Sequence, residues 1–378
     1  MNPSPRRSVL LVLASWQVDA PAGIERATAA LATGLAEAGH HVVIATAAHE
    51  PTGRALPDVT VEALDLGITF PCSDTTLRDA LNASADKLQA RLGDITERHR
   101  TGTVVFTDAL WGLGRLAMDL PTGIRRILAV HVLPHAEDMH PALALADAVI
   151  IPSEFVRSEA LRAGWPAGSW HVVPNALLRE IDPPSASERL ALGESGPIRV
   201  LARLGTEKGV LPLLTAAAAL PSVRPLHVQL AAAAFESADG SQEKLLGQCR
   251  ALADKADHIT LRTGTLPWDE VPDWLAGAAL VIVPSLRETF GLVALEAMSV
   301  ATPVIAYRTG NLPTLLQDGT ATRGLLGELM HGPNALLRLA ERLLADPIAY
   351  ERTSKAMYHL SQDYRPVRIA QQFVKAVS

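Results

Sequence analysis

The sequence of 378 residues is poor in several features that would narrow its function. Its only two cysteines, Cys72 and Cys249, lie far apart and offer neither a disulfide framework nor the spacing of a metal site. Aromatic residues make up only 4% of the chain, and no apolar run approaches the length of a membrane span. We therefore expect reduced thiols in a globular protein and no membrane-spanning segment.

The start of the chain lacks the pattern of a secretion signal. Residues 1–7 are polar, and the apolar run over 8–14 has only seven residues with no cleavage region behind it. We interpret this run as a buried strand and expect a cytoplasmic protein.

Dense runs of lysine and arginine are also missing. The 34 basic residues are outnumbered by 40 acidic ones, which gives a formal charge of −6. This balance argues against nucleic acid as a partner. The helix expected over 24–38 carries Arg26 against Glu25 and Glu37, so it gives no strong signal for binding a membrane surface. Glu25 and Arg26 are interpreted by default as a solvated first turn.

Short apolar runs alternate with helix-like segments along most of the chain. A strand over Val9–Ala14, a helix over Ile24–Ala38 and a strand over His41–Thr46 form a βαβ unit, which predicts a parallel sheet with a right-handed crossover. Thr75–Arg98 has the pattern of one long amphipathic helix. The fold class is therefore α/β, and the length predicts two domains of ordinary size.

The most informative stretch runs from Leu280 to Leu316. It begins with a buried strand, passes through a loop that holds Glu288, and continues into a helix over Phe290–Val300 that holds Glu296. A helix N-terminus suits phosphate, and a carboxylate can accept two hydrogen bonds from a vicinal diol. Glu288 is expected to bind sugar hydroxyls and Glu296 ribose hydroxyls. The alternative, that Glu296 is a capped surface residue and Glu288 an ordinary acid at a helix N-terminus, stays open.

Both glutamates are embedded in the pattern PSxxExFGLxxLEAMxxxxPVIA. This pattern resembles the donor-site signature of family-4-like, retaining GT-B glycosyltransferases. The resemblance implies a GT-B fold, in which two Rossmann-like domains face each other across a cleft. It also implies a nucleotide-sugar donor bound mostly by the C-terminal domain, with the acceptor mostly on the N-terminal side. The nucleotide-binding residues that it implies here are Phe290, Gly291 and Leu292, with Thr265 and Leu266 beside the base.

A basic pair precedes this stretch. The segment from Arg203 to Gly209 resembles the family's GRxxxxKG element, although Ala202 replaces the usual glycine. Arg203 offers a planar fork of donors and Lys208 a point charge, and both suit a diphosphate. The alternative is a solvated turn. A second departure is the run Ala231–Ala234, where the family has a Gly-x-Gly type turn.

In the N-terminal half, the signals lie after expected strands. Gly23 opens a helix where backbone can approach a ligand closely, and it resembles part of the family's first loop. His131 follows the strand over Ile127–Val130, and the resemblance makes it an active-site histidine that reaches the donor sugar. The alternative is a hydrogen-bonded structural histidine. His131 and His135 are separated by Pro134, which disfavours the helical geometry of a zinc pair. We expect no metal site.

The residues expected to face the acceptor are rings and hydrogen-bonding groups on loops. Such groups could stack against and hydrogen-bond a small, soluble, polar acceptor such as a cyclitol, a sugar or another natural-product core. The alternative is that they are ordinary loop residues. The candidates are Trp16, Asp108, Trp111 and His135.

Together with these residues, the resemblance implies a retaining glycosyltransferase of glycan or natural-product biosynthesis. It would move a sugar from a UDP-, GDP-, ADP- or dTDP-sugar to an acceptor hydroxyl without a metal or other cofactor. A GT-B-fold sugar-nucleotide epimerase or hydrolase is the alternative, and a non-catalytic ligand-binding protein is a weaker one. The expected domains are an acceptor-side domain over 1–178, a linker over 179–197, a nucleotide-sugar-binding domain over 198–360, and a helix over 361–378 that crosses back to the first domain.

Overall fold

The computed structural model describes residues 8–47, 56–67, 72–107, 112–115, 120–220, 224–232, 240–317, 319 and 322–378. The chain divides into two compact units. Unit 1 consists of residues 1–179 and 364–378, and unit 2 consists of residues 180–363.

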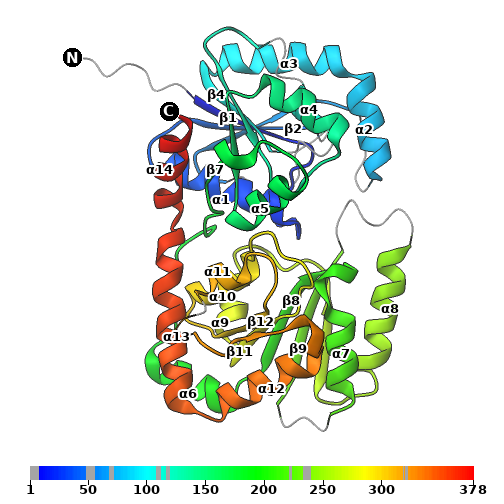
Figure 1. Ribbon diagram of the computed structural model, residues 1–378, viewed down its shortest axis with the longest axis vertical. Coiled ribbons are helices and arrows are strands. Elements are labelled where there is room, and N and C mark those ends of the chain that lie inside the picture. The colour runs from blue at the N-terminus through cyan, green and yellow to red at the C-terminus, as the bar shows by residue number, and fades with distance from the viewer. Residues whose placement is uncertain are drawn as a thin grey trace, which may run out of the picture. The chain divides into compact units, whose positions relative to one another are not determined.

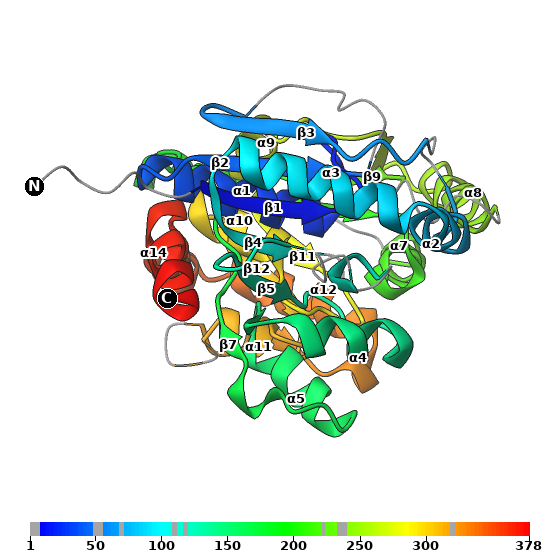
Figure 2. The same ribbon diagram turned by 90° about the horizontal axis from the view of Figure 1, so that it is seen from above.

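Unit 1 is built on a parallel sheet of seven strands in the order β3-β2-β1-β4-β5-β6-β7. Figure 2 shows the labelled strands of this sheet in that order. The central strand β1 is buried along its whole length, as its uninterrupted apolar run predicts. The strands are β1 (Ser8–Leu13), β2 (Val42–Thr46), β3 (Val59–Ala63), β4 (Thr101–Phe106), β5 (Arg125–Ala129), β6 (Ala148–Ile151) and β7 (His171–Val172).

Helices cover both faces of this sheet. In Figure 1, α2 and α3 lie on one side of the strands and α1 on the other. The single helix expected over 75–98 is in fact two helices, because Ser84, with φ −111° and ψ 15°, leaves the helical conformation between them. The helices are α1 (Gly23–Glu37), α2 (Asp74–Ala83), α3 (Ala85–Arg98), α4 (Ala136–Leu145), α5 (Glu154–Arg162) and α14 (Pro366–Val377).

The last helix, α14, belongs to unit 1 and packs against α1. Its apolar face, with Ile369 and Phe373, is fully buried. The two helices come so close that a Cβ atom at Gly34 would overlap the carbonyl oxygen of Pro366. Glycine in the middle of α1 is therefore a packing requirement and not a helix break.

Unit 2 is built on a second parallel sheet, of six strands in the order β10-β9-β8-β11-β12-β13. The run Leu280–Val283 forms the buried strand β11, as its composition predicts. The strands are β8 (Ile198–Arg203), β9 (Leu226–Ala231), β10 (Ile259–Thr263), β11 (Leu280–Val283), β12 (Val304–Tyr307) and β13 (Leu326–Gly327).

Two groups of helices flank the second sheet. One group consists of α7, α8 and α12, which pack together, and the other of α9, α10 and α13 (Figure 1). The helices of unit 2 after β8 are α7 (Val210–Ala218), α8 (Ser241–Ala253), α9 (Val271–Ala276), α10 (Leu292–Ser299), α11 (Leu312–Leu315), α12 (Pro333–Leu344) and α13 (Pro347–Ser361).

The stretch 179–197, expected to be a linker, contains the helix α6 (Ala186–Ser195), which packs against α13. The helix begins with a capping box: the Ser185 hydroxyl accepts from the Glu188 amide at 3.3 Å, and the Glu188 carboxylate accepts from the Ser185 amide at 2.8 Å. The Arg189 side chain is buried and donates to the carbonyl oxygen of Ala278 at 2.6 Å. These contacts make most of the expected linker a part of unit 2.

Candidate functional site

The strand order of unit 2 reverses between β8 and β11. Strands β9 and β10 lie on one side of β8, whereas β12 and β13 lie beyond β11. In open parallel sheets, ligands bind outside the carboxyl ends of the strands at such a point. Arg203 is the last residue of β8, Lys208 lies in the 3-10 turn Thr206–Lys208 that follows it, and Glu288 lies in the loop after β11. The fold thus brings these three expected site residues to one edge of the sheet.

Two ion pairs connect the charged side chains at this edge. Lys208 Nζ donates to Glu288 Oε2 at 3.0 Å, and the two side chains are only 20% and 16% exposed. Arg203 Nη2 donates to Glu207 Oε1 at 2.7 Å. Each basic group that was expected to bind a diphosphate therefore contacts a carboxylate, with which an incoming anion must compete.

Glu207 was not among the expected site residues. Its spacing of four residues from Arg203 is the signal that the sequence offers for this ion pair. Because a turn lies between the two residues, that spacing alone does not show that their side chains meet. The Glu207 carbonyl oxygen also accepts from the Leu286 amide at 2.8 Å, so this residue ties the loop after β8 to the loop after β11.

Two glycines with positive φ allow the loops to approach this closely. At Gly209 (φ 65°) a Cβ atom would overlap the carbonyl oxygen of Pro284, and at Gly310 (φ 57°) it would overlap that of Glu288. The Glu288 carbonyl oxygen accepts from the Asn311 amide at 3.0 Å. Gly310 and Asn311 therefore hold the Glu288 backbone in place.

The helix after Glu288 is shorter than expected: it spans Leu292–Ser299 and not Phe290–Val300. Gly291 precedes α10 with φ 104°, a conformation that favours glycine, and Leu292 is the first helical residue. Phe290 is buried, and its carbonyl oxygen accepts from the Asn311 side-chain amide at 3.0 Å. Glu296 is also buried, so the interpretation of Glu296 as an ordinary surface acid is wrong. Its expected contact with ribose remains a prediction.

The loop after β10 lies at the same edge of the sheet. Gly264 donates its amide to the carbonyl oxygen of Leu230 at 3.0 Å, and its own carbonyl oxygen accepts from Gln229 at 2.6 Å. Thr265 is exposed and Leu266 half-buried, so both can be reached by a ligand. In the alanine run that departs from the family pattern, Ala231 ends β9, whereas residues 233 and 234 lie outside the described residues.

Unit 1 has its own reversal of strand order, between β1 and β4. The loop after β1 leads to an exposed Gly23 at the start of α1. The next two residues, Glu25 and Arg26, are buried, with 5% and 8% of their surface exposed, so the expectation of a solvated first turn is wrong. The Ser15 hydroxyl donates to Glu25 Oε1 at 2.8 Å. This contact fixes the loop relative to the helix.

His131 follows β5, one strand beyond that point. It lines a cavity of about 30 Å³ together with Thr28, Thr107 and Asn175. Burial lowers the pKa of its imidazole to about 4. The ring is therefore neutral near pH 7, where it can donate one hydrogen bond and accept another.

The expected acceptor residues differ in their surroundings. Trp16 is buried, with 3% of its surface exposed, whereas His135 is exposed just before α4. Asp108 and Trp111 lie outside the described residues. Asp138, three residues after His135, is buried and forms an ion pair with Arg78. The role of the four candidates in acceptor binding remains a prediction.

Within the described residues, no group of three or more histidine, cysteine, aspartate or glutamate side chains could hold a metal ion. Metal-independent activity remains a prediction. No helix in the described part of the chain is both long enough and apolar enough to cross a membrane.

Two family models match the chain in succession. The model of the glycosyl transferase 4-like domain matches residues 22–176, and the model of glycosyl transferases group 1 matches residues 192–360. The second match contains Arg203, Lys208 and Glu288. The chain belongs to the family-4-like glycosyltransferases.

Relatives with a known name agree with this family. A D-inositol 3-phosphate glycosyltransferase of Thermobifida fusca is 30% identical over 227 residues, which are 57% of this chain and 51% of that protein. The chain thus spans about half the length of this relative. The chain also matches 41% of an α-D-kanosaminyltransferase of Streptomyces kanamyceticus. It matches 20% of a D-inositol 3-phosphate glycosyltransferase of Streptomyces bingchenggensis.

Solved structures confirm the GT-B fold class. Sucrose-phosphate synthase from Thermosynechococcus elongatus superposes with a TM-score of 0.77 at 21% identity and covers 98% of both chains. Anabaena Alr3699/HepE, in complex with UDP and glucose, superposes with a TM-score of 0.74 at 18% identity and covers 98% of this chain and 99% of its own. At these identities the likeness concerns the fold.

Proposed function

We propose that this family-4-like protein transfers a sugar from a nucleotide-sugar donor to a hydroxyl of a small, polar acceptor, with retention of anomeric configuration. The observation that carries the proposal is the placement of Arg203, Lys208 and Glu288 at the strand-order reversal of unit 2. The two cations suit a diphosphate, and the carboxylate suits sugar hydroxyls. In a nucleotide-sugar donor, these two groups lie on either side of the bond that breaks.

The chemical step requires stabilisation of the leaving diphosphate, on which negative charge develops as the glycosidic bond breaks. Arg203, Lys208 and the N-terminus of α10 supply preorganised positive charge for this purpose, and the backbone at Gly23 is a further donor. Glu288 orients the donor sugar. In front-face attack with retention, a donor phosphate oxygen accepts the proton of the acceptor hydroxyl, so the mechanism assigns no protein side chain as general base.

His131 acts on the donor sugar in this mechanism. Its depressed pKa keeps the imidazole neutral near pH 7, so it serves as a hydrogen-bonding group and not as a cation. This distinguishes it from Arg203 and Lys208, whose charge is the basis of their role.

The identity of donor and acceptor is proposed from the relatives. The complex of Alr3699/HepE with UDP and glucose makes a UDP-sugar the first donor to test. The name of the Thermobifida fusca relative supports a cyclitol phosphate or another small polyhydroxylated molecule as the first acceptor. The residues of unit 1 that we assign to the acceptor are Trp16, Asp108, Trp111 and His135.

A binding panel tests the donor assignment. UDP, GDP, ADP and dTDP are compared by thermal shift and calorimetry, each as the free diphosphate and as a nucleotide sugar. A nucleotide at a hundredfold excess over its Kd should stabilise the native protein by about 2.7 kcal/mol. The Lys208→Ala variant should lose most of this effect. If no nucleotide binds, the donor-site assignment is wrong.

Product analysis tests the reaction. With an acceptor present, a transferase forms a glycoside, and the anomeric configuration of the product can be read by NMR. Rapid turnover of the donor to free sugar or to an epimer without any acceptor would instead identify a hydrolase or an epimerase.

A further inference from the structure

A second cavity, of about 340 Å³, lies in unit 2 at the edge of the sheet opposite the candidate donor site. Its lining includes Ile198 and Leu226, the first residues of β8 and β9, and His258, which directly precedes β10. These are the amino ends of the strands, whereas Arg203 and Lys208 follow the carboxyl end of β8. The volume falls within the range of about 300 to 1,000 Å³ that is typical of small-molecule sites.

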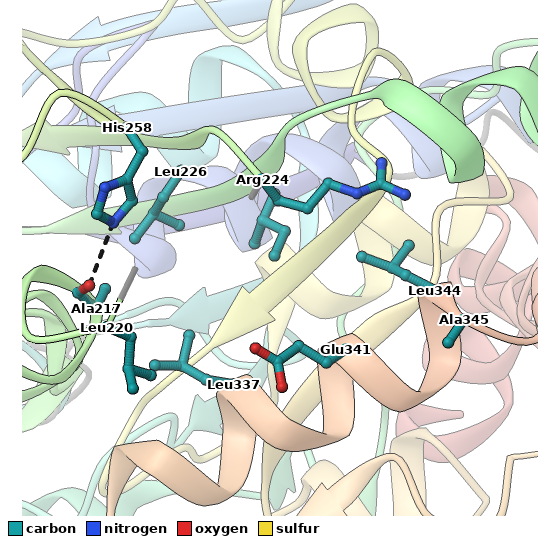
Figure 3. A pocket seen from close by; sticks show the side chains of 10 residues that line it. Ala217, Leu220, Arg224, Leu226, His258, Leu337, Glu341, Leu344 and Ala345 are labelled. Carbon is teal, nitrogen blue, oxygen red and sulfur yellow. Dashed lines mark hydrogen bonds between the residues drawn. The ribbon is translucent and has the colours of Figure 1, made fainter. Parts of the chain in front are cut away.

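The walls of this cavity are mostly aliphatic. Leu337 and Leu344 face it from α12, and Leu220 faces it from the end of α7 (Figure 3). Leu220 is 40% exposed, which makes it one of the few large apolar side chains with so much surface in contact with water. An apolar ligand body that covers these leucines would gain the free energy of removing their surface from water.

Three polar side chains line the cavity, and two of them already bind main-chain carbonyls. Arg224 donates to the carbonyl oxygens of Gly193 and Gly196 at 2.8 and 3.2 Å. His258 Nε2 lies 3.2 Å from the carbonyl oxygen of Ala217, a contact drawn as a dashed line in Figure 3.

The third polar side chain, Glu341, differs from these two. It projects from α12 between Leu337 and Leu344 (Figure 3), and its carboxylate has no hydrogen-bond or ion-pair partner among the residues that the structure describes. Arg224 keeps its positive charge, but its guanidinium is held against the carbonyl oxygens of Gly193 and Gly196, so Glu341 is the charged group that can pair with a ligand. An aliphatic cavity with such a carboxylate is complementary to an apolar molecule that ends in a cation.

We propose that this cavity is a second ligand site, and that its ligand is a small amphipathic amine. The alkyl or aryl body packs against Leu220, Leu337 and Leu344, and the ammonium group pairs with the Glu341 carboxylate. At about 30 Å³ for each water-sized group, the cavity has room for about ten such groups. This site is independent of the proposed transfer reaction, because its ligand is recognised at the opposite edge of the sheet.

Three probes of equal chain length test the charge preference: hexylamine, hexan-1-ol and hexanoate, titrated calorimetrically and by ligand-observed NMR at constant ionic strength. Hexylamine should bind about threefold to fivefold more tightly than hexan-1-ol, which is the contribution of one exposed ion pair. Hexanoate should bind most weakly. In Glu341→Gln, hexylamine and hexan-1-ol should bind equally well.

A cavity-filling variant tests the location. Ala345 lines the cavity and is exposed at the end of α12, so Ala345→Trp should fill it without disrupting the fold and should abolish binding of all three probes. Ile348→Trp is the matched control, because Ile348 is 79% exposed three residues further along and does not line the cavity. Thermal melting establishes that both variants are folded.

Several outcomes would overturn the proposal: no saturable binding of any probe, tighter binding of hexanoate than of hexylamine, or equal binding by Ala345→Trp and the native protein. An unchanged preference for hexylamine in Glu341→Gln would also overturn it, because the carboxylate would then not be the recognised group.

Discussion

The ion pair between Lys208 and Glu288 leads to a prediction in which binding and turnover change in opposite directions. Glu288 is the proposed partner of the donor sugar, but it also contacts the cation that is proposed to bind the diphosphate. UDP lacks the sugar that is transferred, so it gains nothing from Glu288 and must compete with it for Lys208. The substitution Glu288→Gln should therefore strengthen the binding of UDP while it reduces the turnover of the UDP-sugar.

The expected magnitude follows from the geometry. Two unit charges separated by 3.0 Å interact by about 5 kcal/mol at an effective dielectric constant of about 20. Desolvation and screening reduce the net value of such a pair to about 1 kcal/mol. Release of Lys208 from this pair should therefore tighten UDP binding about fivefold. Loss of the group that orients the sugar should lower kcat about 10²-fold.

The assay combines calorimetry with UDP and initial rates with the UDP-sugar. The control is Glu351→Gln, which makes the same change of charge in an ion pair of 2.6 Å with Lys355 on α13, away from the donor loops. This control should leave both quantities within twofold. Weaker binding of UDP by Glu288→Gln would refute the reasoning, because Glu288 would then position Lys208 and not compete for it.

Four further predictions concern the same molecule. Arg203→Ala and Lys208→Ala should each lower turnover by about 10²- to 10³-fold while the melting temperature stays near that of the native protein, and near-normal rates in both would remove them from the site. Turnover should persist in excess EDTA, and a complete loss that Mg²⁺ or Mn²⁺ restores would contradict the metal-independent mechanism. The folded pKa of His131, about 4, lies below its unfolded value of about 6.5, so the unfolded state takes up this proton first and stability is lost as pH falls through this window. Between these two pH values, the free energy of unfolding measured in urea should fall by up to about 1.4 kcal/mol per pH unit in the native protein but not in His131→Asn. The same dependence on pH in both proteins would contradict the assignment of this effect to His131. Gly310→Ala should abolish UDP binding or cost more than about 2 kcal/mol of stability, because its Cβ would strike the Glu288 backbone at positive φ, whereas Gly247→Ala on open helix surface should cost nothing.

The donor half of the site could be predicted from the sequence because its signals are local. The pattern around Glu288 and Glu296 fixes a strand, a loop and a helix in one continuous stretch, and the structure has all three. Gly291 belongs to the same pattern, and the structure gives it the positive φ that glycine tolerates. What the sequence did not reveal is the pairing of Lys208 with Glu288, because 80 residues separate them.

Errors arose where tertiary contacts decided the outcome or where a local signal was overlooked. Glu25 and Arg26 look like solvated residues in a helix's first turn, and only the packing around them shows that they are buried. The helix α6 is different. Its capping box, Ser185 with Glu188, was visible in the sequence but was outweighed by the prolines and serines around it. Acceptor residues have no such pattern, since any ring on a loop could serve.

The position of α14 has a consequence for the order in which the protein is made. A ribosome completes residues 180–363, the whole of unit 2, before it adds the helix that covers α1 in unit 1. Until then the surface around Gly34 lacks the cover of Ile369 and Phe373, although the seven strands of unit 1 have already been synthesised. The N-terminal unit therefore begins to fold first but acquires its full core last, so a released chain truncated before residue 364 should hold a folded unit 2 and an incompletely packed unit 1.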